Sequence, residues 1–415
     1  MNKKILIIGN SAKEYSLVKI LSEKYQIFVA PGSDTIREFA TCVDIREDSV
    51  KELLEFVMEN DIDLTIPVST KALKSNLVDV FNKNGQKAFG PLKDTAEIIF
   101  NKTSMKKILY KLKIPTPKFG IFEKQNIALD YIKNTKQPFV IKSNEQSSAV
   151  ILTSLTTAKT VLDTAFCQNN PRILIEDYIW GTPFSFYVIT DGYNALPLGS
   201  SITYKYALDG DGGQLTSGMG ACAPNYKLSL DNEDFLMNEV TYPILNYLNS
   251  NDNIYLGILG INGILTEDNK IQILGFEPFM QDCDSNAIIN ILDTDIIPLI
   301  ESCIIGSFSD DVDFIPQKDM FSTSIVLTCV NKNNKENLIT GLEYLDEDIS
   351  INFYPQIKKN RFLEYEAETG SVMVLTSTAR TVSSSVNKVY EEIKNIKFKG
   401  LSYRKDICKA INTDL

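Results

Sequence analysis

Histidine is absent from the 415-residue sequence, and cysteine is scarce. The absence of histidine excludes Ser-His-Asp catalysis, histidine proton shuttles and histidine-containing zinc sites. The seven cysteines include no Cys-x-x-Cys pair, which is typical of free thiols in a cytoplasmic protein. We expect Cys222 to face a ligand cleft, and Cys42, Cys303 and Cys329 to behave as small core hydrophobes.

Long apolar runs and an excess of positive charge are also missing. No run approaches the roughly 18 apolar residues that span a membrane, and the N-terminal run Ile5–Gly9 is too short for a signal peptide. The net charge of −11 argues against a nucleic-acid partner, because phosphates would be repelled. The chain is therefore expected to be globular, with two to four domains and with neither a membrane nor a nucleic-acid partner.

The first 91 residues alternate between short apolar runs and amphipathic helical patterns. Strands are expected over residues 5–9, 26–32, 63–68 and 87–91, with a helix over 71–83. This alternation predicts a parallel sheet covered by helices, whose ligand sites follow Gly9, Gly32 and Val68 at the carboxyl ends of strands. Ser11 and Glu14 form a capping box, and a helix start also attracts anions. Ordinary capping and phosphate binding both remain open for this helix start.

The segment Asp209–Pro224 contains five glycines and two aspartates without a helical or strand period. Glycine in such a segment indicates positive φ or a close approach of the backbone to another group. One interpretation is a tight surface loop or a β-bulge. The other is a loop that folds over a small ligand, with carboxylates beside exposed amides.

Two stretches carry a resemblance to a known family. Thr216–Pro224, preceded by Asp209-Gly-Asp211, resembles the Asp-Gly-Asp…Thr-Gly-Gly-Met-Gly-Ala-Tyr-Ser-Pro stretch of the phosphoribosylamine–glycine ligases, in the ATP-grasp superfamily. Phe398–Ile407 resembles the ending Phe-x-Gly-x-x-Tyr-Arg-x-Asp-Ile of the same family. Matching segments keep their order along the whole chain. The family forms glycinamide ribonucleotide in purine biosynthesis, where ATP phosphorylates glycine and the amine of phosphoribosylamine attacks the acyl phosphate.

The resemblance implies an α/β and α+β multidomain fold of ATP-grasp type. It has a Rossmann-like N-terminal parallel-sheet domain, a lid subdomain and a C-terminal α+β domain. The expected units are the N-terminal domain, a linker with a helix, the lid, the large subdomain and the C-terminal domain, over residues 1–91, 92–114, 115–184, 185–315 and 316–415. The lid is expected to be the most mobile unit, because proline-rich linkers bound it.

The resemblance also implies a site for ATP, Mg²⁺, glycine and phosphoribosylamine. The expected ATP-binding residues are Lys102, Lys142, Glu176, Tyr178 and Ile179. The expected substrate-binding residues are Gly9, Lys13, Gly218, Met219 and Gly220. The expected catalytic residues are Lys205 and Asp211, and the expected metal ligands are Glu277 and Asp282. Without the resemblance, a lysine at the end of an apolar strand, such as Lys142, is equally well explained as a surface lysine.

The nucleotide side of this implied site departs from the family pattern. On a gapless comparison, Gly275 stands where the family has its metal-binding Glu, and Glu277 where it has Asn. Pro183 stands where a Glu holds the ribose of ATP. The run Ser143–Val150 replaces a glycine-rich phosphate loop, contains no glycine and includes Glu145. Binding of Mg·ATP is therefore expected to be weak or absent.

The substrate side departs as well. Val68-Ser-Thr70 replaces Gly-Pro-Glu, Phe279 replaces an Arg, and Thr203-Tyr-Lys-Tyr206 keeps only the Lys of Asp-His-Lys-Arg. Losing one strong electrostatic group in a closed site costs about 3–4 kcal/mol of transition-state stabilisation. Three functions remain open: an active ligase, a ligase with a changed substrate, and a catalytically degenerate member. The degenerate member would bind a nucleotide or metabolite as a regulator, or act as a partner of a purine enzyme.

Overall fold

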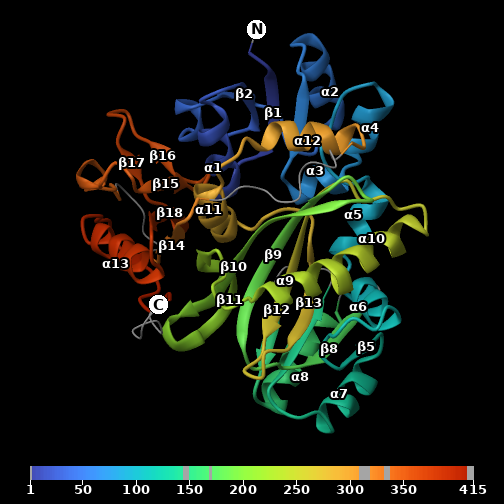
Figure 1. Ribbon diagram of the computed structural model, residues 1–415. Helices are drawn as coiled ribbons and strands as arrows, with labels where there is room; N and C mark the ends of the chain where they lie inside the picture. Colours follow the sequence, from blue (N-terminus) through green and yellow to red (C-terminus); the bar gives the residue numbers. More distant parts are fainter. Residues whose placement is uncertain (1, 144–148, 168–170, 308–317, 331–336, 409–415) are drawn as a thin grey trace.

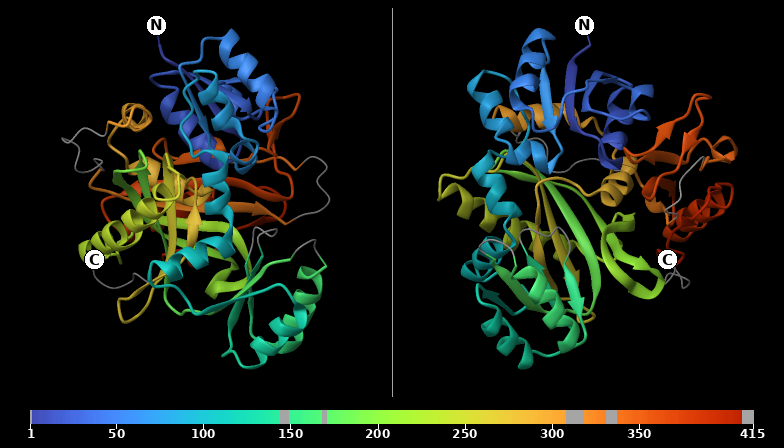
Figure 2. Two further views of the ribbon diagram at one scale, coloured as in Figure 1. Left: turned by 90° about the vertical axis from the view of Figure 1, so that its right-hand side faces the viewer. Right: turned by 180° about the vertical axis from the view of Figure 1, so that it is seen from behind.

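The computed structural model describes residues 2–143, 149–167, 171–307, 318–330 and 337–408 (Figure 1). These residues form a four-stranded, a nine-stranded and a second four-stranded sheet with their covering helices, and a two-stranded ribbon. The N-terminal sheet lies at one end of the molecule and a small four-stranded sheet at the other, with a nine-stranded sheet between them (Figures 1 and 2).

The N-terminal sheet is parallel and has the strand order β3-β2-β1-β4. Its central strand β1 is buried from Ile5 to Gly9, as expected for a strand covered by helices on both faces. The elements of this part are β1 Lys4–Gly9, α1 Ala12–Leu21, β2 Gln26–Pro31, a 3₁₀ turn Ile36–Glu38, β3 Thr41–Cys42, α2 Val50–Glu59, β4 Leu64–Pro67, α3 Thr70–Lys74, α4 Leu77–Lys83, α5 Lys93–Phe100 and α6 Lys102–Lys111. The parallel sheet predicted from the alternating pattern is confirmed.

Two local expectations for the N-terminal part are wrong. The single helix predicted over 71–83 is broken at Asn76, which adopts the left-handed conformation with φ of 69° and starts α4. The strand predicted over 87–91 is reduced to a single bridge between Thr65 and Ala88. This short run follows Gly85 closely and contains Gly90. It pairs with β4 at one residue only, so no strand forms.

The small sheet is antiparallel and has the order β5-β8-β6-β7. Its elements are β5 Phe119–Phe122, α7 Gln125–Lys133, β6 Phe139–Ser143, β7 Val150–Leu152, α8 Leu155–Ala165 and β8 Ile173–Asp177. The two helices pack their apolar faces on this sheet around Phe139, Leu162 and Ile175. Residues 144–148, which include Glu145 and most of the predicted phosphate-loop replacement, lie outside the described residues.

The nine-stranded sheet is antiparallel and joins the middle of the chain to its C-terminal part. Its order is β13-β12-β9-β10-β11-β14-β18-β15, with β19 paired to β14. The segment 182–304 contributes β9 Thr182–Thr190, β10 Ala195–Leu208, a 3₁₀ turn Asp209–Asp211, β11 Gly212–Ala223, α9 Leu230–Phe235, a π-helical turn Leu236–Thr241, α10 Tyr242–Asn249, β12 Gly257–Leu265, β13 Ile271–Glu277, α11 Asp282–Ile291 and α12 Ile296–Ile304.

The C-terminal part adds strands to that same sheet. Its elements are β14 Phe321–Cys329, a 3₁₀ turn Leu342–Tyr344, β15 Ser350–Phe353, β16 Lys358–Lys359, β17 Tyr365–Glu366, β18 Gly370–Ala379, α13 Val382–Ile393 and β19 Leu401–Ser402. Residues 220–223 of β11 pair with residues 322–325 of β14, so the sheet runs without interruption from the middle of the chain into this part. The residue boundaries proposed for the five units stay a prediction.

The glycine-rich segment forms a β-hairpin rather than a loop. Its residues Gly212–Ala223 make up β11, which pairs with β10 on one side and β14 on the other. The expectation of a loop is therefore wrong for these residues, whereas the β-bulge of the first interpretation agrees with the register shifts between β10 and β11. The strand period was hidden because the β10–β11 pairing shifts register twice, on either side of Tyr206. Gly218 adopts φ of 142°, which a residue with a side chain rarely adopts.

All seven cysteines are free, as predicted. Cys303 and Cys329 are buried, as expected of core hydrophobes, whereas Cys42 is half-buried. The expectation that Cys222 faces a ligand cleft is wrong, because its side chain lies fully buried in the core beside Thr323. Within the described residues, no helix has the length and apolar character needed to cross a membrane.

The hairpin turn is held by a buried arginine from the chain's C-terminal segment. The guanidinium of Arg404 binds Asp406 through Nε and Nη2, at 2.8 and 2.7 Å, and its Nη1 lies 2.9 Å from Oδ1 of Asp211. The backbone N–H of Lys405 donates to Oδ1 of Asp209, and that of Gly210 donates to Oδ2 of Asp406, which joins the same two segments. Such charge-assisted, partly bidentate bonds fix geometry as well as adding stability.

Replacement Arg404→Met is therefore expected to lower the free energy of unfolding by about 2 kcal/mol. The loss stays near this value because both carboxylates retain contact with solvent, at 58% and 31% side-chain exposure. Urea unfolding would measure it, with Arg380→Met, at an exposed arginine, as the matched control. Equal stabilities of the two variants would contradict a holding role for Arg404.

Candidate functional site

A buried carboxylate between two lysines anchors the site. Glu176 lies on β8 with 1% of its side chain exposed, and its Oε2 is 2.9 Å from Nζ of Lys106. Its other oxygen, Oε1, forms an ion pair with Lys142 on the neighbouring strand β6. Burial raises the pKa of Glu176, but Lys142 and Lys106 outweigh that effect and hold the pKa below its usual range. The side chain of Glu176 is thus used to hold two lysines.

Lys106 was missed by the sequence interpretation. It lies one helical turn after Lys102 on α6, so both lysines share one helix face, and this i, i+4 spacing is the signal that could have found it. Burial lowers the pKa of Lys106 to about 8. Because α6 contains several lysines, the sequence interpretation did not separate Lys106, which is buried, from Lys107, which is exposed.

Lys102 stands at the first turn of α6, where its Nζ donates to the carbonyl oxygen of Ser143 at 3.0 Å. Burial lowers the pKa of Lys102, and the positive charge of Lys142 lowers it further, whereas Glu277 and Glu176 oppose these effects. The structure therefore brings together four of the predicted site residues: Lys102, Lys142, Glu176 and Glu277.

Glu277 ends β13 and is half-buried. Burial raises its pKa, and the neighbouring cations Lys205, Lys102 and Lys13 act in the opposite direction. These lysines come from β10, α6 and α1, so three separate parts of the fold place positive charge around one carboxylate. Lys205 also approaches Oδ1 of Asn262, at 3.5 Å.

Gly275 leaves an open space two residues before Glu277. A Cβ atom built at this glycine would meet no heavy atom within 4 Å. Across the sheet, Gly275 is opposite Asn262 on β12, and Asn262 is opposite Ser185 on β9. Oγ of Ser185 donates to Oδ1 of Asn262 at 2.9 Å. Among the described residues, nothing fills this space, which the gapless comparison aligns with a metal-binding carboxylate of the family.

Asp282, the second predicted metal ligand, is engaged elsewhere. It stands in the first turn of α11, and its Oδ1 accepts hydrogen bonds from Oγ of Ser11 at 2.5 Å and from the backbone N of Lys13 at 3.0 Å. In the part of the chain that the structure describes, no three His, Cys, Asp or Glu side chains are grouped to hold a metal ion. Mg²⁺ between two phosphates needs hard oxygen ligands held in octahedral geometry, and Glu277 alone does not fit that requirement.

The start of α1 is a capped helix end, and the capping interpretation is confirmed. Oε2 of Glu14 accepts from the backbone N and the Oγ of Ser11, at 2.8 and 2.7 Å. Nζ of Lys13 lies 3.2 Å from Oε1 of Glu14 and 4.0 Å from Oδ1 of Asp282. Gly9 is required here, because a Cβ atom at this position would lie 2.1 Å from Oε1 of Glu14. Two carboxylates therefore occupy the place where an anion would bind.

The remaining predicted residues are spread over the strands. Gly218 and Gly220 allow β11 to pack closely, since added Cβ atoms would lie 3.0 Å from Sγ of Cys283 and 2.7 Å from the carbonyl oxygen of Ser324. Met219 is buried, and Asp211 binds Arg404 at the far end of the hairpin. The hydroxyl groups of Tyr178 and Tyr206 are 3.2 Å apart, and Ile179 is half-buried nearby.

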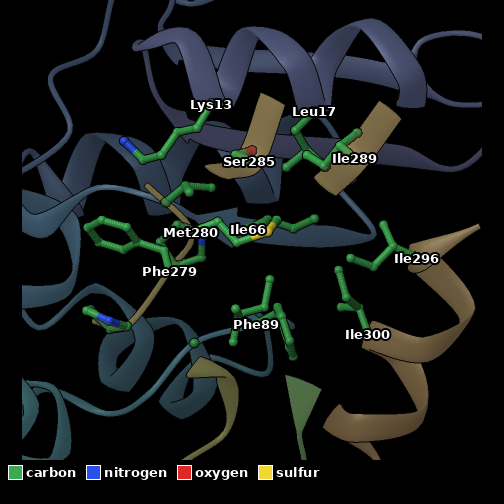
Figure 3. Close-up of a pocket in the computed structure, with 15 residues that line it drawn as sticks. Lys13, Leu17, Ile66, Phe89, Phe279, Met280, Ser285, Ile289, Ile296 and Ile300 are labelled. Atoms are coloured by element: carbon green, nitrogen blue, oxygen red, sulfur yellow. The ribbon is translucent and has the colours of Figure 1, made fainter. Parts of the chain in front are cut away.

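A small apolar cavity lies at the carboxyl end of β4 (Figure 3). Its volume is about 50 Å³, and its lining includes Lys13, Val68, Phe279, Ile296 and Ile300. The ring of Phe279, which the gapless comparison aligns with an arginine of the family, lies 5.1 Å from Nζ of Lys13. The sequence interpretation placed a ligand site after Val68 but missed the contribution of α12, whose residues reach the N-terminal domain (Figure 1).

Comparison with known proteins gives matches along the chain. The phosphoribosylglycinamide synthetase N domain matches residues 3–98, and the ATP-grasp (A) domain of the same synthetase matches residues 100–285. The phosphoribosylamine–glycine ligase of Caldanaerobacter subterraneus subsp. tengcongensis is 28% identical over 416 residues, covering 97% of this chain and 99% of the relative. That of Halalkalibacterium halodurans is 29% identical over 419 residues, covering 98% and 97%.

Solved structures show the same fold. The phosphoribosylamine–glycine ligase of Thermotoga maritima has a TM-score of 0.81 at 19% identity, over 97% of this chain and 99% of that one. A biotin carboxylase domain of Hydrogenobacter thermophilus, solved with MgADP and bicarbonate, has a TM-score of 0.73 at 14% identity, over 97% and 92%. The predicted multidomain ATP-grasp fold is thus confirmed. Since the two synthetase models together match more than half of the chain, it belongs to the phosphoribosylglycinamide synthetase family of ATP-grasp proteins.

Proposed function

We propose that this chain is a nucleotide-binding member of the family in which the ligation of glycine to phosphoribosylamine is lost or strongly reduced. The open space at Gly275 carries this proposal, because it removes a carboxylate from the place where the family holds its metal. The family reaction relies on a metal and lysines to neutralise the transferring phosphoryl group. With Asp282 engaged by Ser11 and Lys13, Glu277 is left as the sole predicted ligand.

The lysines expected at the nucleotide phosphates support the proposal that the chain binds a nucleotide. Lys102 and Lys142 lie close enough for their charges to interact, and Glu176 fixes Lys142 from below the surface. A chain that had lost all use of a nucleotide would have no need for a buried carboxylate between two lysines, because such an ion pair costs desolvation energy. As a binding protein, the chain would act as a regulator or as a partner of an active purine enzyme.

The phosphoribosylamine side supports the loss of ligation. The carboxylates of Glu14 and Asp282 accept hydrogen bonds at the N-terminus of α1, and Lys13 forms an ion pair with Glu14. Phe279 supplies an apolar ring where a phosphate or carboxylate would need a cation. A second candidate, a ligase with a changed substrate, is favoured by the apolar cavity beside Lys13, which would suit a small apolar group in place of a ribose.

The direct test is turnover with glycine, phosphoribosylamine generated in situ, and Mg·ATP, followed by ADP release. We expect a rate at least about 100-fold below that of the Caldanaerobacter ligase assayed in parallel, since one lost electrostatic group costs a factor of 10²–10³. Turnover at the level of that ligase, abolished by Lys142→Ala and by Glu277→Ala, would contradict the proposal. Replacing glycine by apolar amino acids in the same assay tests the changed-substrate candidate.

A second prediction concerns the support of Lys142. Lys106→Met leaves Glu176 buried with one cationic partner, and breaking a buried ion pair in this way costs about 3–5 kcal/mol. We expect a lower unfolding midpoint and at least tenfold weaker nucleotide binding, because Lys142 loses its fixed position. Lys107→Met, at the exposed neighbour on the same helix, is the matched control. An unchanged affinity in the Lys106 variant would show that the nucleotide does not bind at this part of the site.

A further inference from the structure

Two buried cysteines from distant parts of the chain meet beneath its C-terminal segment. Cys222 belongs to β11, and Cys408 follows β19. Their side chains are 0% and 3% exposed, and both belong to one hydrophobic cluster. The two thiols are also in hydrogen-bond contact with each other. Neither cysteine has a part in the candidate site, so the pair calls for a separate explanation.

The strand pairing explains why the two cysteines meet. Gly220 of β11 pairs with Tyr204 of β10, and Cys222 lies two residues further along β11. Side chains two residues apart on a strand point to the same face of the sheet. The C-terminal segment covers this face, because a Cβ atom built at Gly220 would lie 3.1 Å from Cδ1 of Ile407. The next residue, Cys408, is thereby brought to Cys222.

Two tyrosines hold the C-terminal segment in this place. The hydroxyl of Tyr204 donates to Sγ of Cys408 at 3.5 Å and accepts from its backbone N at 3.0 Å. Cys408 adopts a φ of 54°, which residues with a side chain rarely adopt, and these two hydrogen bonds stabilise it there. The backbone N–H of Ile407 donates to the hydroxyl of Tyr390 at 3.1 Å. The thiol of Cys408 is therefore fixed beside its partner.

The two thiols differ in their chemistry. The hydrogen bond from Cys222 holds the pKa of Cys408 below its usual range, and Tyr204 and Lys227 act in the same direction against the effect of burial. The hydrogen bond to Cys408 and burial both raise the pKa of Cys222. Because the thiolate is the nucleophilic form of cysteine, Cys408 is the nucleophile of the pair and Cys222 is the thiol that stays protonated.

We propose that Cys222 and Cys408 form a reversible disulfide when hydrogen peroxide oxidises the chain. The thiolate of Cys408 attacks one peroxide oxygen, the O–O bond breaks, and the products are a sulfenic acid and hydroxide. Sγ of Cys222 then attacks the sulfenic sulfur, and its proton leaves with the hydroxyl group as water. Two electrons pass from the thiol pair to the peroxide, and a dithiol reductant reverses the reaction by exchange. A small oxidant suits a buried pair.

The disulfide would fix the C-terminal segment on the β10–β11 hairpin. This segment already carries Arg404, which binds Asp211 at the hairpin turn. A covalent link between residues far apart in the sequence also restricts the unfolded chain, so the oxidised form should be the more stable one. The gapless comparison aligns Cys222 with the Tyr of the family stretch, so this thiol pair is not part of the family pattern.

Peptide mapping of the full chain tests the inference. The protein is treated with hydrogen peroxide, alkylated, and digested with trypsin without a reductant. We expect a disulfide between the peptides 206–227 and 406–409, which disappears after treatment with dithiothreitol. The unfolding midpoint of the oxidised protein should exceed that of the reduced protein by at least about 2 °C. Cys167, which is exposed, shows by its own oxidation that the peroxide is active.

Single replacements separate the roles of the two thiols. In Cys222→Ala, the sulfenic acid of Cys408 has no partner and should persist, so that dimedone labels it, and the midpoint should not rise. In Cys408→Ala, Cys222 should remain a free thiol. Cys303→Ala, at another buried cysteine, is the matched control and should form the disulfide as the wild type does. Oxidation of Cys167 without the disulfide, or equal dimedone labelling of Cys408 in the wild type and in Cys222→Ala, would overturn the inference.

Discussion

The hydrogen bonds of Asp282 to the start of α1 join the N-terminal domain to the nine-stranded sheet. A carboxylate in this position satisfies a helix N-terminus that would otherwise carry unpaired N–H groups, and it binds the hydroxyl of Ser11 as well. Both partners are fixed parts of the fold, so the carboxylate is not free to turn toward a ligand. This contact links two domains and engages a carboxylate that the sequence predicts as a metal ligand.

The electrostatics of the cleft follow from that constraint. With Asp282 committed and Gly275 lacking a side chain, the end of β13 presents one carboxylate, Glu277, surrounded by lysines from three elements. On the opposite side, Glu176 holds Lys142 and Lys106 inside the protein. The fold of the family is retained, and we propose that its nucleotide lysines are kept while the groups that drive phosphoryl transfer are lost.

The sequence predicted the parallel sheet well, because buried strands such as β1 and β4 are apolar runs with helical patterns between them. It predicted the capped start of α1 for the same kind of local reason, since Ser11 and Glu14 are three residues apart. It failed where the outcome depends on distant segments. The strand β11 was hidden by its glycines and its register shifts, and Cys222 was misplaced because β14, about a hundred residues later, covers it.

Parts of the site lay beyond sequence reasoning for physical reasons. The spacing of Lys106 from Lys102 places both on one face of α6, but the sequence does not show that Glu176, on a strand 70 residues away, is the partner of Lys106. Nothing local shows that Asp282 is used by α1, since its partners lie at the other end of the chain. The roles assigned to the individual site residues stay predictions.

Crystals grown with ATP and Mn²⁺ would test the central claim most directly, because manganese gives an anomalous signal that separates it from water and from an ammonium group. We predict a nucleotide bound beside Lys102 and Lys142, and no anomalous peak at Glu277. An anomalous peak that bridges the phosphates and is coordinated by Glu277 would contradict it.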